Sequence, residues 1–228
     1  MSKRYFTPKL FMFLKDLAEN NDREWFKAHQ DEYEEHVREP ALEFINDFAE
    51  PLGKISSHFV VDSRKVGGSL FRIQRDTRFS KDKTPYKVNT GMQFRHRAGK
   101  DVHAPGFYVH LQPGGCYMGV GLWRPETQVA YVIRRHIDEN QTVWKRASRG
   151  KRFTDVFEID GDTLKRPPKG FDEGHPLIED LKRKDFIGSA RLTQRSITSD
   201  TFIDEFADNC KRSVPFMKLL CDAIGIPF

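Results

Sequence analysis

Apolar residues at helical spacing open the chain. Thr7-Pro8 is typical of a helix start, because threonine is a favoured N-cap and proline fits the first helical turn. The apolar stripe that follows repeats every three or four residues, at Leu10, Phe13, Leu14 and Leu17. Asn20-Asn21 ends this predicted helix, and Asp22 is suited to cap a second one.

Two further apolar stripes extend the helical part. The second helix carries Trp25, Phe26, Tyr33 and Val37. Pro40 is expected to interrupt or kink it, because proline removes a helical hydrogen bond. Beyond it the stripe resumes at Ala41, Phe44, Ile45 and Phe48. Pro51 and Gly53 end the pattern, so residues 1–53 are predicted to form an N-terminal helical part.

From Val60 the pattern changes to short runs typical of β-strands. These runs are Leu70–Gln74, Met92–His96, Phe107–Gln112 and Cys116–Gly121. In the third run apolar and polar side chains alternate, which indicates a strand with one buried and one solvated face. Pro113-Gly114-Gly115 joins the third run to the fourth and predicts a hairpin.

Helical and strand patterns mix in the C-terminal part. Pro125 is expected to open a helix. Its apolar stripe is Val129, Val132, Ile133 and Ile137. A short helix is predicted over Pro176–Leu181 and a late strand over Phe186–Leu192. Asp200 is expected to cap a final helix, and Pro215 to kink it.

Helices at both ends of a strand-rich block define the α+β class. We expect a central, mainly antiparallel sheet flanked by N-terminal and C-terminal helices. Residues 1–228 are predicted to form a single domain, with the helical part at 1–53 and the sheet and remaining helices at 60–228. The sequence contains no internal repeat, low-complexity tract or convincing linker.

Charge is unevenly distributed along the chain. The formal net charge is +5, but residues 1–63 carry 8 basic and 13 acidic side chains, so this part is at −5 and the remainder at +10. A basic surface that attracts anions is one interpretation of this asymmetry. A solvated basic face without a partner is the other.

Cysteine use and hydropathy indicate the compartment. Cys116, Cys210 and Cys221 form no CxxC pair and leave one odd thiol, which is typical of a reduced environment. No apolar run approaches the ~20 residues that span a bilayer, and the N-terminus lacks a signal-peptide apolar block. We therefore expect a cytoplasmic protein that does not bind a membrane.

The densest chemistry lies in residues 72–87, which we call the basic loop. It holds six cations and two carboxylates, with Arg or Lys at every third position from 72 to 81. Converging guanidinium groups suit phosphate or carboxylate, and the aromatic rings of the loop offer stacking surfaces. The predicted ligand-binding residues are Arg72, Arg75, Arg78, Phe79, Lys81, Lys83, Tyr86, Lys87 and, outside the loop, Arg124.

The alternative for the basic loop is structural. Asp76 and Asp82 can pair with neighbouring cations and turn the loop into a salt-bridged brace between the helices and the sheet. Arg124 is included among the ligand-binding residues for a different reason. It lies at a strand-to-helix junction, where backbone N–H groups can bind an anion. Trp123 beside it is expected to be a core anchor.

Three stretches resemble the signatures of one family of uncharacterised proteins of bacteria and fungi, a domain of unknown function. They are Asn20–Phe26, Phe71–Lys87 with its RDTRFSKDKTPYK core, and Gly121–Pro125. The resemblance extends over nearly the whole chain, and the second signature is long enough to be specific. It implies family membership and no particular activity. It also singles out the segments that the residue chemistry selects.

Catalytic, metal and cofactor signals are weak. Asp76 and His110 are the candidate catalytic residues, the second as a general base on one strand face. Asp76 and Asp82 lie among cations, which favours ion pairing over binding of Mg²⁺. The eight histidines form no HExxH motif, so no metal site is predicted. Gly119-Val120-Gly121 lacks the third glycine of a dinucleotide fingerprint, and Gly67-Gly68-Ser69 lacks the P-loop lysine, so no cofactor is predicted.

Three functions remain compatible with the sequence. The leading hypothesis is a binding domain for a small anionic ligand, bearing phosphate or carboxylate and held by the basic loop. The second is a hydrolase or transferase whose cationic side chains stabilise developing charge on an anionic substrate. The third is a structural or interaction module. Nucleic acid is disfavoured as a partner, because the first 63 residues are acidic and the loop suits one or two anionic groups better than a long phosphate backbone.

Overall fold

An antiparallel sheet lies at the centre of the protein. The computed structural model describes residues 3–99 and 104–228. In these residues six strands pair in the order β1-β2-β3-β4-β6-β5, and all neighbours are antiparallel. They are β1 (Phe59–Val60), β2 (Thr90–His96), β3 (Gly106–Leu111), β4 (Tyr117–Leu122), β5 (Glu158–Asp160) and β6 (Phe186–Arg191). The α+β class and the mainly antiparallel sheet that the sequence predicts are confirmed.

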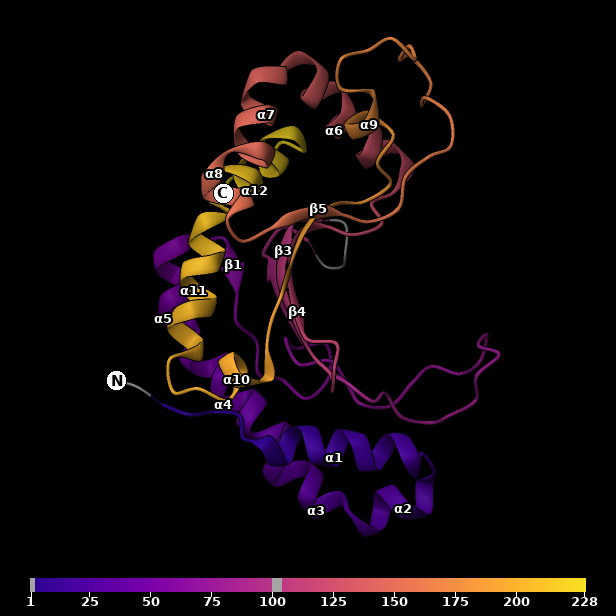
Figure 1. The fold of residues 1–228 in the computed structure, drawn as a ribbon, viewed down its shortest axis with the longest axis vertical. Coiled ribbons are helices and arrows are strands. Elements are labelled where there is room, and N and C mark those ends of the chain that lie inside the picture. Colours follow the sequence, from indigo (N-terminus) through magenta and orange to yellow (C-terminus); the bar gives the residue numbers. More distant parts are fainter. Residues whose placement is uncertain (1–2, 100–103) are drawn as a thin grey trace.

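Helices cover both ends and one side of this sheet (Figure 1). The N-terminal ones are α1 (Pro8–Glu19), α2 (Arg23–Ala28), α3 (Gln30–Tyr33), the π-helix η1 (Glu34–Arg38), α4 (Glu39–Asp47) and α5 (Ala49–Ile55). The later ones are α6 (Thr127–Glu139), α7 (Gln141–Arg149), α8 (Lys151–Thr154), α9 (Ile178–Leu181), α10 (Gln194–Ile197), α11 (Phe202–Arg212) and α12 (Val214–Ala223). In the part of the chain that the structure describes, no helix has both the length and the apolar character needed to cross a membrane.

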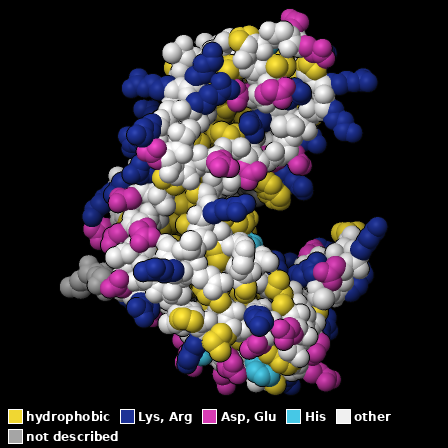
Figure 2. All heavy atoms as spheres, viewed as in Figure 1, with side chains coloured by type: hydrophobic (Ala, Val, Ile, Leu, Met, Phe, Trp, Pro, Cys, Tyr) yellow, Lys and Arg dark blue, Asp and Glu magenta, His cyan; other side chains and the backbone are white. Residues whose placement is uncertain are grey.

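The arrangement leaves one side of the sheet uncovered. In Figure 1, α5 and α11 lie along one side of the strands, α1 to α3 lie at one end, and α6, α7 and α9 lie at the other. No helix is drawn on the remaining side. The space-filling view is hollowed there, between the two ends of the molecule (Figure 2).

The covered face of the sheet carries the core. Its buried strand residues are Met92, Phe94, Phe107, Val109, Leu111, Met118, Val120, Leu122 and Phe186. Aromatic contacts tie this face to helices from both halves of the chain. The Phe48 ring centroid lies 4.7 Å from that of Phe94 and 4.9 Å from that of Phe206. Phe44 stacks on Phe202 at 5.3 Å, so the N-terminal helices, α11 and the sheet share one core.

Local sequence signals set the start of the N-terminal helices. Thr7 is the N-cap of α1, with proline in the first turn. The Asp22 carboxylate accepts hydrogen bonds of 2.9 and 2.8 Å from the backbone N–H groups of Glu24 and Trp25, and so caps α2. The interruption predicted at Pro40 is confirmed, and it takes the form of the π-helix η1 immediately before α4.

The prediction of a strand over Leu70–Gln74 is wrong. Leu70 bridges Met92 beside β2, whereas Gln74 bridges Tyr86 of the basic loop. The backbone therefore leaves the sheet between these two residues, and each bridge stays isolated. Strands β1 and β5 were not predicted, because strands of two and three residues are too short to show a period.

Several helix boundaries differ from the prediction. Pro51 and Gly53 lie inside α5 instead of ending it, and the helix predicted from Pro176 begins at Ile178. Pro125 precedes α6, which begins at Thr127. Thr201, and not Asp200, is the N-cap residue of α11. Pro215 lies in the first turn of α12, where proline is tolerated because the first N–H groups have no helical partner. The final helix is therefore divided into α11 and α12 instead of being kinked.

Candidate functional site

The basic loop folds as an irregular hairpin. Its two sides are joined by backbone hydrogen bonds from Arg75 N to Pro85 O and from Lys87 N to Ile73 O, of 2.9 and 2.8 Å. The loop extends away from the body of the protein at the lower right of Figure 1. It therefore forms one rim of the hollow seen in Figure 2.

Both carboxylates of the loop pair with arginines of the loop. The Arg78 guanidinium donates to the Asp76 carboxylate at 2.9 and 2.6 Å, and Arg75 pairs with Asp82. Arg78 holds the pKa of Asp76 well below its usual range, and Arg75 lowers the pKa of Asp82 to about 2. Asp76 therefore carries a charge that is already matched, which does not suit a general base at neutral pH.

Two further cations of the loop are engaged by backbone oxygens. Lys83 Nζ donates to the Thr77 carbonyl and Lys87 Nζ to the Arg72 carbonyl, both at 2.9 Å. Burial lowers the pKa of Lys87. Among the described residues, Arg72 and Lys81 are the loop cations whose side chains have neither an ion pair nor a hydrogen bond. The six cations thus lie along the loop and do not converge on one pocket.

The root of the loop is held by the first signature. The Asn21 side chain exchanges two hydrogen bonds with the backbone of Tyr86, of 3.0 and 3.1 Å. The Phe26 ring stacks on the Tyr86 ring with centroids 4.1 Å apart, so one face of Tyr86 is occupied. Phe79, by contrast, is 95% exposed, with the Arg78 guanidinium 5.8 Å from its ring centroid. Of the two predicted stacking rings, Tyr86 is therefore packed against the protein and Phe79 is exposed to solvent.

The uncovered face of the sheet, which we call the open face, carries a chain of polar side chains along β3. Nε2 of His110 donates to the side-chain oxygen of Gln112 at 2.9 Å. The Tyr108 hydroxyl donates to Nδ1 of the same ring, also at 2.9 Å. Burial lowers the pKa of His110 and raises that of Tyr108. Both groups are therefore neutral at pH 7.

Aromatic rings extend this chain to either side. Tyr117 on β4 stacks on His110 with centroids 4.7 Å apart. On the β2 side, the Phe71 ring lies 5.8 Å from that of Tyr108, and Lys87 Nζ lies 5.5 Å from the Phe71 centroid. The basic loop thus meets the open face at its root, and the candidate base His110 is one ring away from that junction.

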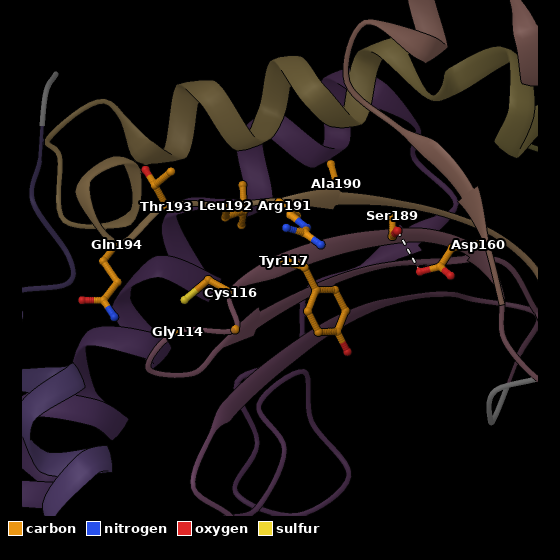
Figure 3. Close-up of a pocket in the computed structure, with 11 residues that line it drawn as sticks. Gly114, Cys116, Tyr117, Asp160, Ser189, Ala190, Arg191, Leu192, Thr193 and Gln194 are labelled. Atoms are coloured by element: carbon orange, nitrogen blue, oxygen red, sulfur yellow. Dashed lines mark hydrogen bonds between the residues drawn. The ribbon is translucent and has the colours of Figure 1, made fainter.

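A cavity of about 600 Å³ lies beside β4 and β6 (Figure 3). Arg191 faces Tyr117 across the two strands, and its guanidinium makes no ion pair or hydrogen bond within the described residues. Ser189, two residues earlier on the same strand, donates to the Asp160 carboxylate at 2.8 Å. The cavity therefore brings an unpaired cation together with hydroxyl groups and one carboxylate.

Arg191, Ser189 and Asp160 were not predicted as site residues from the sequence. A signal was present in the run Phe186–Arg191, where buried residues alternate with more exposed ones. That alternation would have placed Ser189 and Arg191 on one face of a strand. It would not have identified the neighbouring strand, which requires the register with β4.

The third signature lies at the other end of the sheet from the basic loop. Arg124 adopts φ +47°, and its backbone N–H donates to the Asp185 carboxylate at 2.7 Å. Asp185 is buried and also accepts from the N–H of Asp162 at 2.8 Å, so it ties two loops together. Trp123 is 52% exposed, with the Arg124 guanidinium 4.7 Å from its ring centroid. The core anchor predicted at Trp123 is wrong, because the chain turns at Arg124 and leaves the ring on the surface.

Metal chemistry and thiol chemistry find no support among the described residues. No group of three or more His, Cys, Asp or Glu side chains there is arranged to hold a metal ion. Cys116 lines the cavity, but it is buried and burial raises the pKa of its thiol. Cys210 and Cys221 are buried, and burial raises the pKa of Cys221 to about 12. A thiol with so high a pKa is not a nucleophile at neutral pH.

The fold and the open face define an α+β domain whose antiparallel sheet is covered on one side only. The family described as conserved hypothetical protein (DUF2461) matches residues 9–219, and the chain belongs to this family. The family membership that the three signatures predict is thereby confirmed. No curated protein and no solved structure shows significant similarity to the chain.

Proposed function

We propose that the protein binds a small anionic ligand, bearing phosphate or carboxylate, on the open face beside the basic loop. The observation that carries this proposal is the unpaired guanidinium of Arg191 in the cavity of about 600 Å³. A guanidinium stays charged at every physiological pH, and its forked donors match a phosphate or a carboxylate. The Thr193 hydroxyl and the Gln194 side-chain amide, which line the same cavity, supply neutral donors.

The basic loop supports this site through its charge. Six cations and two carboxylates give residues 72–87 a net charge of about +4 at the rim of the hollow. Such a field draws anions toward the open face even where each cation has a local partner. Arg72 and Lys81 are the loop cations whose side chains are unpaired among the described residues, and neither lines the cavity itself.

Phosphate is expected to raise the thermal midpoint of the protein more than chloride at matched ionic strength. A ligand present at about ten times its Kd stabilises the folded state by about 1.4 kcal/mol, which corresponds to roughly 3–5 °C for a chain of this size. Arg191→Ala should abolish the phosphate-specific part of the shift, as measured by differential scanning fluorimetry. Arg195→Ala, an exposed arginine on α10, is the matched control and should respond like the wild type.

A double variant separates the open face from the basic loop. Arg75→Ala with Arg78→Ala removes two cations whose partners are the carboxylates of the loop. If this variant keeps the phosphate response while Arg191→Ala loses it, the loop is a brace with a steering charge. If the double variant loses the response and Arg191→Ala keeps it, the binding site is in the loop and the assignment to Arg191 is wrong.

An enzyme is the second candidate, favoured by the Tyr108–His110–Gln112 chain. Nδ1 of His110 can take the proton of the Tyr108 hydroxyl as that hydroxyl takes one from a substrate, and the lowered pKa of His110 keeps its neutral form present at pH 7. If a panel of phosphate and carboxylate esters reveals turnover, we expect the rate to fall only when the pH drops below the usual range of a histidine pKa, because burial lowers the pKa of His110. His110→Gln should then abolish turnover and leave phosphate binding intact. Unchanged turnover in that variant would exclude His110 as the base.

A further inference from the structure

Gly119 lies in the middle of β4 and has no side chain, and we call the position above it on the open face the depression. This residue faces Tyr108 on β3 and Ser189 on β6 in the strand register. A Cβ atom added there would meet its nearest neighbours, Tyr108 Cβ and Gly188 O, at 4.0 Å, which is ordinary van der Waals contact. Packing within the protein therefore does not require a glycine at this position. Its effect is to leave no side chain on the open face between Tyr108 of β3 and Ser189 of β6.

Aromatic rings border one side of this depression. Tyr117 precedes Gly119 by two residues on β4, so both lie on the same face of the sheet. The Tyr108 and Tyr117 ring centroids are 5.8 Å apart, and Tyr117 is 37% exposed. Aromatic side chains at the edge of a flat floor are suited to stack on a planar ring, a contact worth about 1–3 kcal/mol for a nucleobase.

Polar groups of opposite charge border the other side. Arg191 and the carboxylate of Asp160 line the same cavity, yet no ion pair joins them. Asp160 accepts instead from the Ser189 hydroxyl and from the backbone N–H of Gly161. In Figure 3, Tyr117 and Arg191 extend from neighbouring strands, with Asp160 beyond Ser189. The site therefore offers a cation for an anionic group and an acceptor for an N–H donor.

The width of the site limits the ligand. Neighbouring strands lie about 4.8 Å apart, so the distance from β3 across β4 to β6 is about 10 Å. This span gives room for one ring and its attached anionic group. A site of this width does not extend along the backbone of a polymer such as a nucleic acid.

Resting on the proposed function, we infer that the ligand is a phosphate with an attached planar, amine-bearing ring, as in a nucleoside monophosphate. The phosphate binds Arg191, and the ring lies over Gly119 against Tyr117. Its amine donates to Asp160. A ligand of this class satisfies the cation, the aromatic edge and the carboxylate together, whereas a bare phosphate uses only the cation.

Isothermal titration calorimetry with three probes tests this inference. The probes are inorganic phosphate, ribose 5-phosphate and adenosine 5′-monophosphate, titrated at matched ionic strength. The inference predicts that the nucleotide binds at least about tenfold more tightly than ribose 5-phosphate, because stacking is added. If ribose 5-phosphate and adenosine 5′-monophosphate bind equally well, the protein does not bind the ring and the inference is overturned, while the proposed anion site stands. If none of the three binds, both the inference and the proposed function fail.

Variants at the proposed ring site distinguish binding of the ring from binding of the phosphate. Gly119→Val fills the floor, and Tyr117→Leu removes the stacking ring without touching that floor. Each should abolish the preference for the nucleotide over ribose 5-phosphate and leave the affinity for inorganic phosphate within about twofold. Gly174→Ala, a glycine with open space around it, is the control and should keep the preference. A preference that survives both Gly119→Val and Tyr117→Leu would place the ring elsewhere and overturn the inference.

Discussion

Removal of residues 1–57 is expected to leave an insoluble protein. The deletion takes away Phe44 and Phe48, whose rings contact Phe94, Phe202 and Phe206 in the core. Loss of two buried phenylalanines costs about 6–10 kcal/mol, which is comparable with the whole stability of a domain, about 5–15 kcal/mol. Expression of the fragment 58–228, followed by sedimentation and circular dichroism, measures this outcome.

The control for this deletion removes a segment outside the core. Replacing residues 77–83, the tip of the basic loop, by a short Gly-Ser linker should give a soluble protein with a cooperative thermal transition. The single-domain organisation proposed for residues 1–228 depends on the comparison. A soluble fragment 58–228 that melts cooperatively would show that the N-terminal helices form a separate unit.

Gly121→Ala is expected to destabilise the protein by about 3 kcal/mol or more, through strain and steric overlap together. Gly121 has φ +117°, a backbone conformation that side chains rarely adopt. A Cβ atom there would also lie 2.2 Å from the carbonyl oxygen of Phe186 on the neighbouring strand. The thermal midpoint should fall by roughly 6–12 °C.

Gly119→Ala is the matched control, because it changes a glycine on the same strand and the same face. Its Cβ atom meets nothing closer than 4.0 Å, so the midpoint should shift little. Chemical denaturation of both variants and the wild type would report the two free energies of unfolding. Equal stability of the two variants would show that the sheet adjusts around residue 121 and that the positive φ is not required.

Regular patterns made the longer elements predictable. Helix α1 shows its start in Thr7-Pro8 and its buried stripe in the spacing of four apolar residues. Strand β3 alternates from Phe107 onward, and its polar residues Tyr108 and His110 are those of the open face. Strand β5 has three residues, and it exists because β6 offers a pairing edge, which is a tertiary property.

The candidate site was less predictable, because charge density does not reveal how charges pair. The sequence shows six cations in the basic loop, but pairing depends on which carboxylate the fold brings near. Asp76 lies two residues from its partner Arg78, whereas Asp82 lies seven residues from Arg75. The error for Arg191 was the opposite one, because a candidate site residue was overlooked. It stands alone in the sequence, and it becomes a candidate only because neighbouring strands leave it unpaired beside a cavity.

The first two signatures of the family illustrate the same limit. Asn20–Phe26 and Phe71–Lys87 are far apart in the sequence, and nothing in either one indicates that they touch. In the structure, Asn21 and Phe26 hold Tyr86. The contact explains why both stretches stand out together, since each is half of one junction.

The shared core of the first and last helices has a consequence for synthesis on the ribosome. Phe44 packs against Phe202 and Phe206, which are translated about 160 residues later. At about 5–20 residues per second, this interval lasts roughly 8–32 s. Throughout this interval the nascent N-terminal helices lack the part of their apolar cover that α11 supplies. The uncovered surface is a substrate for chaperones that act during translation, and a slower ribosome lengthens the time for which the chain depends on them.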